Sequence, residues 1–266
     1  MEKSLTRLKK LTNRQKGRGS DKDVKKPEWH WKYLAIFPAW VLFSFIASIA
    51  VISGVLWVME WLHISLENSF SPAAYQTIIS AKVYLLALAI AVGVPYWLNR
   101  NNKTTLSDLG LSRLMSWSDI GLAPVAFLAY ILVAAVTLGI VTSLLPEFPA
   151  DEVQEIGFSL YGPRLDVMLA FLTLVVVAPV AEEVLFRGYL YGKLKAYVPA
   201  VIAAVFTSLA FAAVHLQWNV AIDVFILSMF LCGLRSLTGS LWASILVHML
   251  KNGVAYYILM NPVLGV

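Results

Sequence analysis

The sequence predicts an all-α membrane protein, a polytopic bundle of transmembrane helices with about seven spans. Hydrophobic residues make up 59% of the 266 residues and charged residues only 14%, whereas soluble domains are nearer half apolar and a quarter charged. Apolar segments close to the ~20 residues needed to cross a bilayer also recur along the chain. Because lipid offers backbone groups no hydrogen-bond partners, such segments predict helices.

Seven apolar segments account for the expected spans. The first lies within the 27 uncharged residues between Lys32 and Glu60. A polar stretch at 99–119 is expected to hold a short interfacial helix. The other spans are expected near residues 76–98, 120–145, 166–181, 199–215, 220–234 and 241–260.

The distribution of charge predicts the orientation. Eleven of the 21 Lys and Arg lie in residues 1–32, against four acidic residues there. Basic loops stay cytoplasmic, and basic and acidic loops alternate after this tail. We therefore expect a plasma-membrane protein with a cytoplasmic N-terminus. The tail is expected to contact anionic lipid and no nucleic acid, because no folded basic domain follows it.

Three polar motifs interrupt the apolar segments of the last hundred residues. Ionisable groups inside a membrane are costly and mark functional sites. Each motif contains residues four apart, which share one helix face. An ion pair between Glu183 and Arg187 is expected, with Glu182 pointing elsewhere, and Asp223 is expected near a membrane interface. The motifs are Glu182-Glu183-Val-Leu-Phe-Arg187-Gly188, Phe211-Ala-Ala-Val-His215 and His248-Met-Leu-Lys-Asn252.

A turn expected at 197–199 brings two of these motifs together. Glu182 lies 16 residues before the centre of this turn and His215 lies 17 after it. In antiparallel helices both would lie ~24 Å from the turn. This arrangement requires one helix over 166–196, which is longer than the apolar run. Such a helix must tilt, extend into the cytoplasm or kink at Pro179.

The chemistry of these residue types favours hydrolysis. A carboxylate beside a histidine can deprotonate water for attack on a carbonyl, and a second histidine with an amide can stabilise the oxyanion. The same groups could instead bind zinc through His215, His248 and a glutamate. The sequence contains no nucleophilic Ser or Cys motif, no HExxH and no Gly-rich phosphate loop. The single cysteine, Cys232, excludes an intrachain disulfide.

Taken together, the three motifs resemble those of the CPBP family, the CAAX-prenyl-endopeptidase-like and bacteriocin-processing (Abi) intramembrane proteases. The resemblance covers about residues 165–260. It implies that Glu182 and His215 activate a water molecule and that His248 and Asn252 stabilise the oxyanion. A zinc-dependent mechanism, with Glu182, His215 and His248 as ligands, and a metal-free one are both compatible with it. The resemblance assigns supporting positions to Glu183, Arg187 and Phe211.

The resemblance implies an intramembrane endopeptidase acting on a membrane-associated peptide or protein, possible substrates being lipid-modified or membrane-anchored ones. It divides the chain into the basic tail (1–32), N-terminal transmembrane helices (33–160) and a catalytic helical core (161–266). Two other functions are compatible with the motifs. One is a non-catalytic scaffold or bacteriocin self-immunity protein. The other is a proton-coupled transporter, for which the sequence shows no inverted repeat.

Overall fold

The computed structural model describes residues 29–64, 70–100, 103–150 and 163–260, and these residues form helices and connections without a strand. The all-α polytopic bundle is therefore confirmed. Most of the basic tail and the acidic residues of the loop after Ala150 lie outside the described residues.

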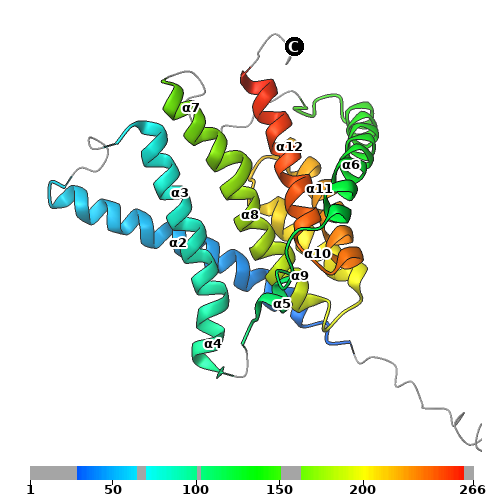
Figure 1. Cartoon of the computed structure of the whole chain (residues 1–266), viewed down its shortest axis with the longest axis horizontal. Helices are drawn as coiled ribbons and strands as arrows, with labels where there is room; N and C mark the ends of the chain where they lie inside the picture. The colour runs from blue at the N-terminus through cyan, green and yellow to red at the C-terminus, as the bar shows by residue number, and fades with distance from the viewer. Residues whose placement is uncertain (1–28, 65–69, 101–102, 151–162, 261–266) are drawn as a thin grey trace, which may run out of the picture.

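The N-terminal helices form a hairpin on the left of the molecule in Figure 1. Helix α2 spans Tyr33–Trp61. Helix α3 (Pro72–Leu88) continues through the π-helical turn η2 (Ala89–Gly93) into α4 (Val94–Leu98), giving one mostly apolar rod of 27 residues. The indole of Trp40 in α2 donates a hydrogen bond of 3.0 Å to a carbonyl of η2, that of Ala91.

Two capping boxes organise the next segment. The short helix α5 (Leu106–Leu109) begins at Thr105, whose side chain exchanges hydrogen bonds with Asp108. The long helix α6 (Trp117–Leu144) begins in the same way at Ser116 with Asp119. A short helix within the polar stretch 99–119 was predicted, and α5 confirms it.

One helix of 31 residues, from Arg164 to Leu194, carries the first motif. The single helix expected over 166–196 is confirmed to within two residues at each end, because the helix continues through the charged residues after residue 181. At ~1.5 Å per residue it exceeds the ~30 Å hydrocarbon core of a bilayer. Its parts are α7 (Arg164–Phe171), the π-helical η4 (Leu172–Val177), α8 (Ala178–Glu182), the π-helical η5 (Glu183–Leu190) and α9 (Tyr191–Leu194).

Three further helices complete the bundle, namely α10 (Ala200–Ala213), α11 (Trp218–Thr238) and α12 (Trp242–Met260). With 14 residues, α10 is only ~21 Å long, shorter than the bilayer core. His215 lies in the connection that follows α10, between Ala213 and Trp218. Within the described ranges, six helices are long and apolar enough to span a membrane, and α10 is the shorter seventh of the predicted segments.

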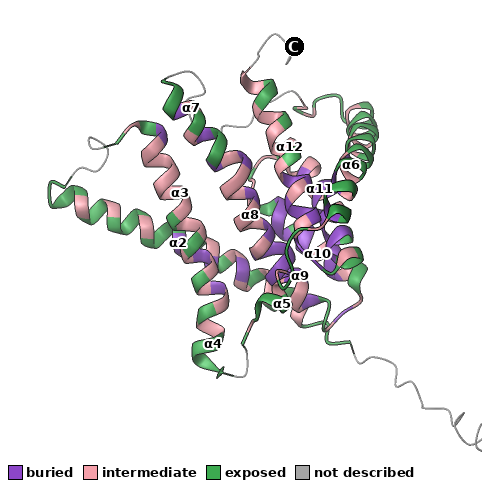
Figure 2. Ribbon diagram, viewed as in Figure 1, coloured by how far each residue is buried: buried purple, intermediate pink, exposed green. Residues whose placement is uncertain are grey.

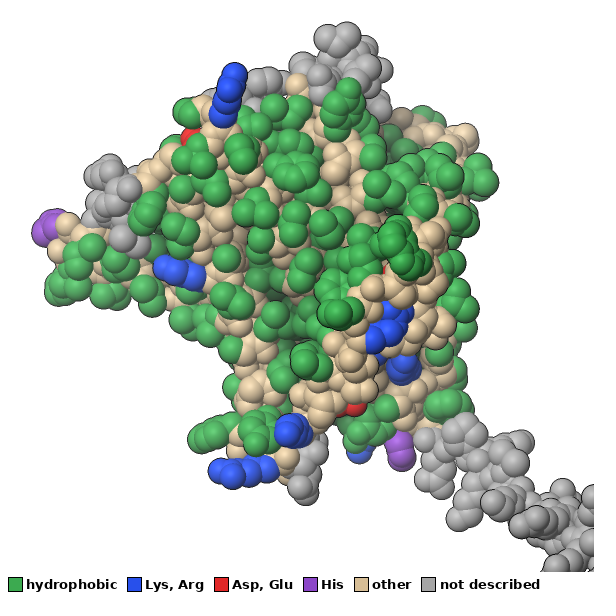
Figure 3. Space-filling view, in the orientation of Figure 1, with side chains coloured by type: hydrophobic (Ala, Val, Ile, Leu, Met, Phe, Trp, Pro, Cys, Tyr) green, Lys and Arg blue, Asp and Glu red, His purple; other side chains and the backbone are tan. Residues whose placement is uncertain are grey.

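The packed core lies on the C-terminal side of the molecule. Buried residues gather around α8, α10, α11 and α12, whereas α6 and the outer half of α2 are largely exposed (Figure 2). Leu132 in α6 and Trp57 in α2, for example, are 66% and 67% exposed. Hydrophobic side chains cover most of the visible face, and Lys and Arg gather mainly toward its lower end (Figure 3). These surfaces are those of a multi-pass membrane protein.

Candidate active site

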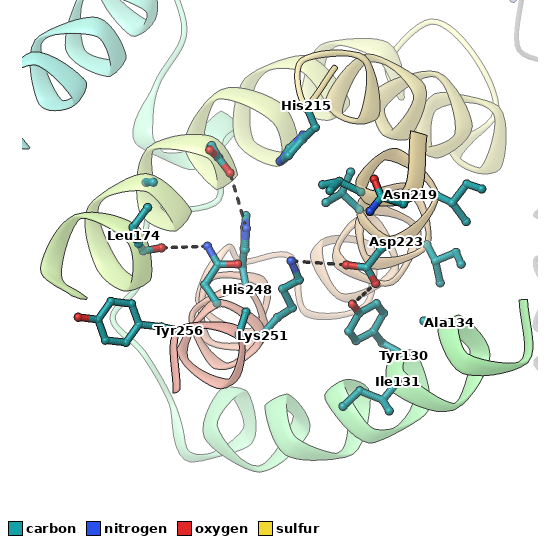
Figure 4. A pocket seen from close by; sticks show the side chains of 18 of the residues that line it. Tyr130, Ile131, Ala134, Leu174, His215, Asn219, Asp223, His248, Lys251 and Tyr256 are labelled. Atoms are coloured by element: carbon teal, nitrogen blue, oxygen red, sulfur yellow. Dashed lines mark hydrogen bonds and ion pairs between the residues drawn. The ribbon is translucent and has the colours of Figure 1, made fainter. Parts of the chain in front are cut away.

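A cavity of about 810 Å³ brings the three motifs together. Glu182, His215, His248 and Asn252, which come from α8, the α10–α11 connection and α12, all line it. In Figure 4, His215 points into the cavity from one wall and Lys251 from another. The predicted meeting of Glu182 and His215 across the α9–α10 turn is consistent with this shared cavity.

The Glu182 carboxylate has two differently placed oxygens. Its Oε1 accepts a hydrogen bond of 2.6 Å from the hydroxyl of Tyr84 in α3. Its Oε2 lies 3.6 Å from Nε2 of His248, which is too long for a direct hydrogen bond. The side chain is 15% exposed. One oxygen of Glu182 is thus held by the protein, while the other faces the imidazole across the cavity.

Glu183 is fully buried and has two partners. Its Oε1 accepts hydrogen bonds from Arg187 at 2.7 Å and from Nδ1 of His248 at 2.9 Å. The predicted ion pair within the helix is confirmed, but the contact with His248 was not predicted. A carboxylate oxygen only accepts, so Nδ1 carries a proton and Nε2 of His248 faces Glu182. Glu183 therefore orients the imidazole as well as balancing the guanidinium.

Phe211 contacts three side chains of the site. The Arg187 guanidinium lies 4.3 Å from its ring centroid, and the ring packs edge-on against His215 and His248, with centroids 5.0 and 5.8 Å away. Its carbonyl oxygen lies 2.9 Å from Nδ1 of His215. A carbonyl only accepts, so Nδ1 is protonated and Nε2 of His215 is the nitrogen able to take a proton. The supporting position of Phe211 therefore has both a side-chain and a backbone basis.

Asn252 is anchored to the helix that carries the first motif. Its amide nitrogen donates a hydrogen bond of 2.9 Å to the carbonyl of Leu174 in η4, and this bond is drawn in Figure 4. The amide carries two N–H groups, so this bond fixes the side chain and leaves a second donor for the site. Asn252 thus shares the cavity with His248, four residues before it.

The opposite wall of the cavity carries a second polar cluster. Nζ of Lys251 in α12 lies 3.5 Å from Oδ2 of Asp223 in α11, and Tyr130 in α6 donates a hydrogen bond to the same carboxylate. Asp223, which is expected near a membrane interface, lines the cavity from the second turn of α11. The Asp223 carboxylate is paired with side chains of two other helices, which explains how its charge is accommodated inside the bundle.

Two cavity residues, Tyr84 and Lys251, were not predicted from the sequence. Tyr84 lies more than 90 residues before the first motif, and tyrosines in apolar segments are common. The sequence could have indicated it in one way, because a tyrosine hydroxyl inside an apolar bundle needs a hydrogen-bond partner. Lys251 lies inside the third motif, three residues after His248. Because ionisable groups inside a membrane are costly and mark functional sites, its charge also indicated a role.

The glycine after Arg187 has a packing role. A Cβ atom on Gly188 would lie 3.1 Å from the carbonyl oxygen of Leu109 in α5 and 3.3 Å from a methyl of Leu241. A hydrogen bond of 3.0 Å from Arg235 to the Asp108 carbonyl holds α5 in place. Gly188 therefore allows α5 to pack directly against the helix segment that carries Glu183 and Arg187.

The zinc site that the family resemblance allows would need Glu182, His215 and His248 to surround one ion. Glu182 and His248 lie close enough to share an ion, but Glu182 already accepts a hydrogen bond from Tyr84. In the part of the chain that the structure describes, no three His, Cys, Asp or Glu side chains are grouped closely enough to hold a metal. In this arrangement Glu182, His215 and His248 are not grouped around one point, as a three-ligand zinc centre requires.

Residues 164–254 match the family model of the Type II CAAX prenyl endopeptidase Rce1-like proteins. The matched segment contains all three motifs and ends two residues after Asn252, so it agrees with the family resemblance. It leaves out α2, α3 and α6, although α3 and α6 contribute Tyr84 and Tyr130 to the cavity. No curated protein and no solved structure matches the chain.

Proposed function

We propose that this multi-pass membrane protein, whose residues 164–254 form an Rce1-like domain, is an intramembrane endopeptidase that hydrolyses a peptide bond with an activated water molecule. The observation that supports it is the convergence of Glu182, His215, His248 and Asn252 on one cavity. A carboxylate, two imidazoles and an amide in one apolar bundle supply a base, an acid and oxyanion donors.

Glu182 and His215 are assigned to the attacking water. The water oxygen bonds to the carbonyl carbon of the scissile peptide, and its proton passes to Oε2 of Glu182 or Nε2 of His215. The same proton then moves to the peptide nitrogen, whose bond to carbon breaks. The hydrogen bonds from Tyr84 to Glu182 and from His215 to the Phe211 carbonyl hold the two bases in place.

His248 and Asn252 are assigned to the oxyanion. Nε2 of His248 faces the cavity because Glu183 holds Nδ1, and the Asn252 amide is fixed through Leu174. Donation from Nε2 requires that this nitrogen carry a proton when the oxyanion forms. Donors held by the protein before the reaction stabilise developing charge most strongly in a low-dielectric site.

The proposed substrate is a membrane-associated peptide, and a prenylated CAAX-type peptide is the first probe because the matched family carries that description. The cavity has apolar walls beside its polar groups, including Ile131, Leu138 and Leu259. We propose the plasma membrane as the location and a cytoplasmic N-terminus, supported by the basic tail. A nucleic-acid partner is not part of this proposal.

The test uses purified protein in liposomes and an internally quenched peptide ending in a prenylated Cys-aliphatic-aliphatic-X sequence. We expect wild-type protein to cleave it and Glu182→Gln, His215→Ala and His248→Ala to lower kcat/KM by at least about 100-fold. Glu60→Gln, the same chemical change at the exposed end of α2, should leave the rate unchanged. Wild-type activity in Glu182→Gln would end the proposal.

Metal removal tests the zinc alternative. The interaction of Glu182 with Tyr84 and the spacing of the three donors support a reaction in which Glu182 acts as a base. We therefore expect less than one zinc per ten proteins by elemental analysis, and unchanged cleavage after treatment with a strong chelator. Stoichiometric zinc that is lost together with activity, and restores activity when added back, would establish the metal-dependent mechanism instead.

A further inference from the structure

We propose that Tyr84 is a positioning residue for Glu182, so that α3, which lies outside the Rce1-like segment, completes the active site. This inference rests on the proposed function, because it assigns Tyr84 a part in activating the water. The hydroxyl of Tyr84 donates to Oε1 of Glu182 at 2.6 Å, across 98 positions of sequence. It is a charge-assisted hydrogen bond, the stronger kind in proteins.

Packing on both sides fixes the Tyr84 side chain. Its ring meets the ring of Phe45 in α2 edge-on, with centroids 5.8 Å apart. About two turns earlier on α3, the hydroxyls of Thr77 and Thr173 lie 2.9 Å apart, which joins α3 to the helix that carries Glu182. Tyr84 is thus held by two neighbouring helices at the depth of the carboxylate.

The consequence for Glu182 follows from its two oxygens. A glutamate side chain has three rotatable bonds, and among the described residues the Tyr84 hydroxyl is the group that holds Oε1 by a hydrogen bond. With Oε1 held by Tyr84, Oε2 is turned toward His248 and the cavity. Reacting groups lose much of their effect when misplaced by about 1 Å. Tyr84 therefore keeps one carboxylate oxygen in the position where it can take a proton from water.

A purely structural role for Tyr84 makes a different prediction. A buried tyrosine hydroxyl needs an acceptor, and if Glu182 served only that need, the loss of the hydroxyl would change stability and leave turnover unchanged. A positioning role predicts that kcat falls while KM and the thermal unfolding midpoint stay near their wild-type values.

The experiment compares Tyr84→Phe with Tyr191→Phe in the full chain. Tyr191 is a matched control, because it is a buried tyrosine whose hydroxyl also shares a helix-bridging hydrogen bond, with Ser236 of α11, but it lies outside the cavity lining. The quenched prenylated peptide serves as substrate in liposomes. We expect Tyr84→Phe to lower kcat by about tenfold to a hundredfold, the range for residues that orient a functional group, with KM within about twofold. Tyr191→Phe should retain the wild-type kcat.

Each outcome bears on the inference. A wild-type kcat in Tyr84→Phe, together with an inactive Glu182→Gln, would overturn the role of Tyr84 and leave the proposed function standing. Equal losses of kcat in Tyr84→Phe and Tyr191→Phe would show a general effect of losing a buried hydroxyl and would also overturn it. If wild-type protein fails to cleave the peptide, or Glu182→Gln remains active, the proposed function itself fails and the inference with it.

Discussion

At the residue scale, two neighbouring glutamates have separate surroundings. Successive residues of an α-helix point about 100° apart, so Glu182 reaches the cavity and Tyr84 while Glu183 is buried against Arg187 and His248. Glu182 is the more accessible of the two, at 15% exposure against none for Glu183. We assign proton transfer to the first and orientation of the imidazole to the second.

Neutralising Glu183 should destabilise the protein. In Glu183→Gln the guanidinium of Arg187, which is also fully buried, loses its charged partner. Breaking a buried ion pair from one side costs about 3–5 kcal/mol, and we expect a loss of this size in chemical unfolding in detergent. The double variant Glu183→Gln/Arg187→Met should recover part of that stability, because no uncompensated charge remains.

The two variants also separate structure from chemistry. His248 keeps no carboxylate at Nδ1 in the double variant, so cleavage should stay low even where stability returns. A double variant no more stable than Glu183→Gln would contradict the view that the buried charge on Arg187 causes the loss.

At the scale of elements, the long helix Arg164–Leu194 contributes to the site through three of its segments. Its η4 segment holds Asn252 through Leu174, its α8 segment carries Glu182, and its η5 segment carries Glu183 and packs on α5. The π-helical segments lie on both sides of Glu182, and such segments are frequent at functional sites. The short α10 ends two residues before His215, and the connection to α11 places His215 at the cavity.

The close packing of α5 on η5 gives a test at this scale. Gly188→Ala would place a Cβ 3.1 Å from a backbone oxygen that cannot move independently of α5, and we expect a loss of about 1–3 kcal/mol. Gly233→Ala in α11 is the control, because no heavy atom lies within 4 Å of the added Cβ. Since alanine is the better helix former, that variant should gain up to about 1 kcal/mol. Urea unfolding in detergent would measure both, and equal effects would contradict the packing account.

At the scale of the whole molecule, most of the fold could be predicted from composition, because long apolar segments leave few alternatives to spanning helices. The pair Glu183 and Arg187 could be predicted as well, since residues four apart meet on any helix. The hydrogen bond from Tyr84 to Glu182 and the cluster of Asp223 with Lys251 could not. They depend on how separate helices pack, and hydrophobic patterns in lipid do not specify that packing.

The N-terminal helices are more than a membrane setting for the Rce1-like segment. Tyr84 of α3 and Tyr130 of α6 reach the cavity and bind carboxylates of the C-terminal half. The site is therefore a property of the whole bundle, although the motifs that carry the family resemblance all lie between residues 164 and 254.

The most direct test of the central claim compares protein termini in the membranes of cells producing wild-type protein or Glu182→Gln at equal levels. Mass spectrometry of these termini requires no assumption about the substrate. We predict that at least one membrane-associated protein carries a new terminus only with the wild type, while its uncut precursor accumulates with Glu182→Gln. The same termini in equal amounts in both samples would contradict the claim that Glu182 serves peptide hydrolysis.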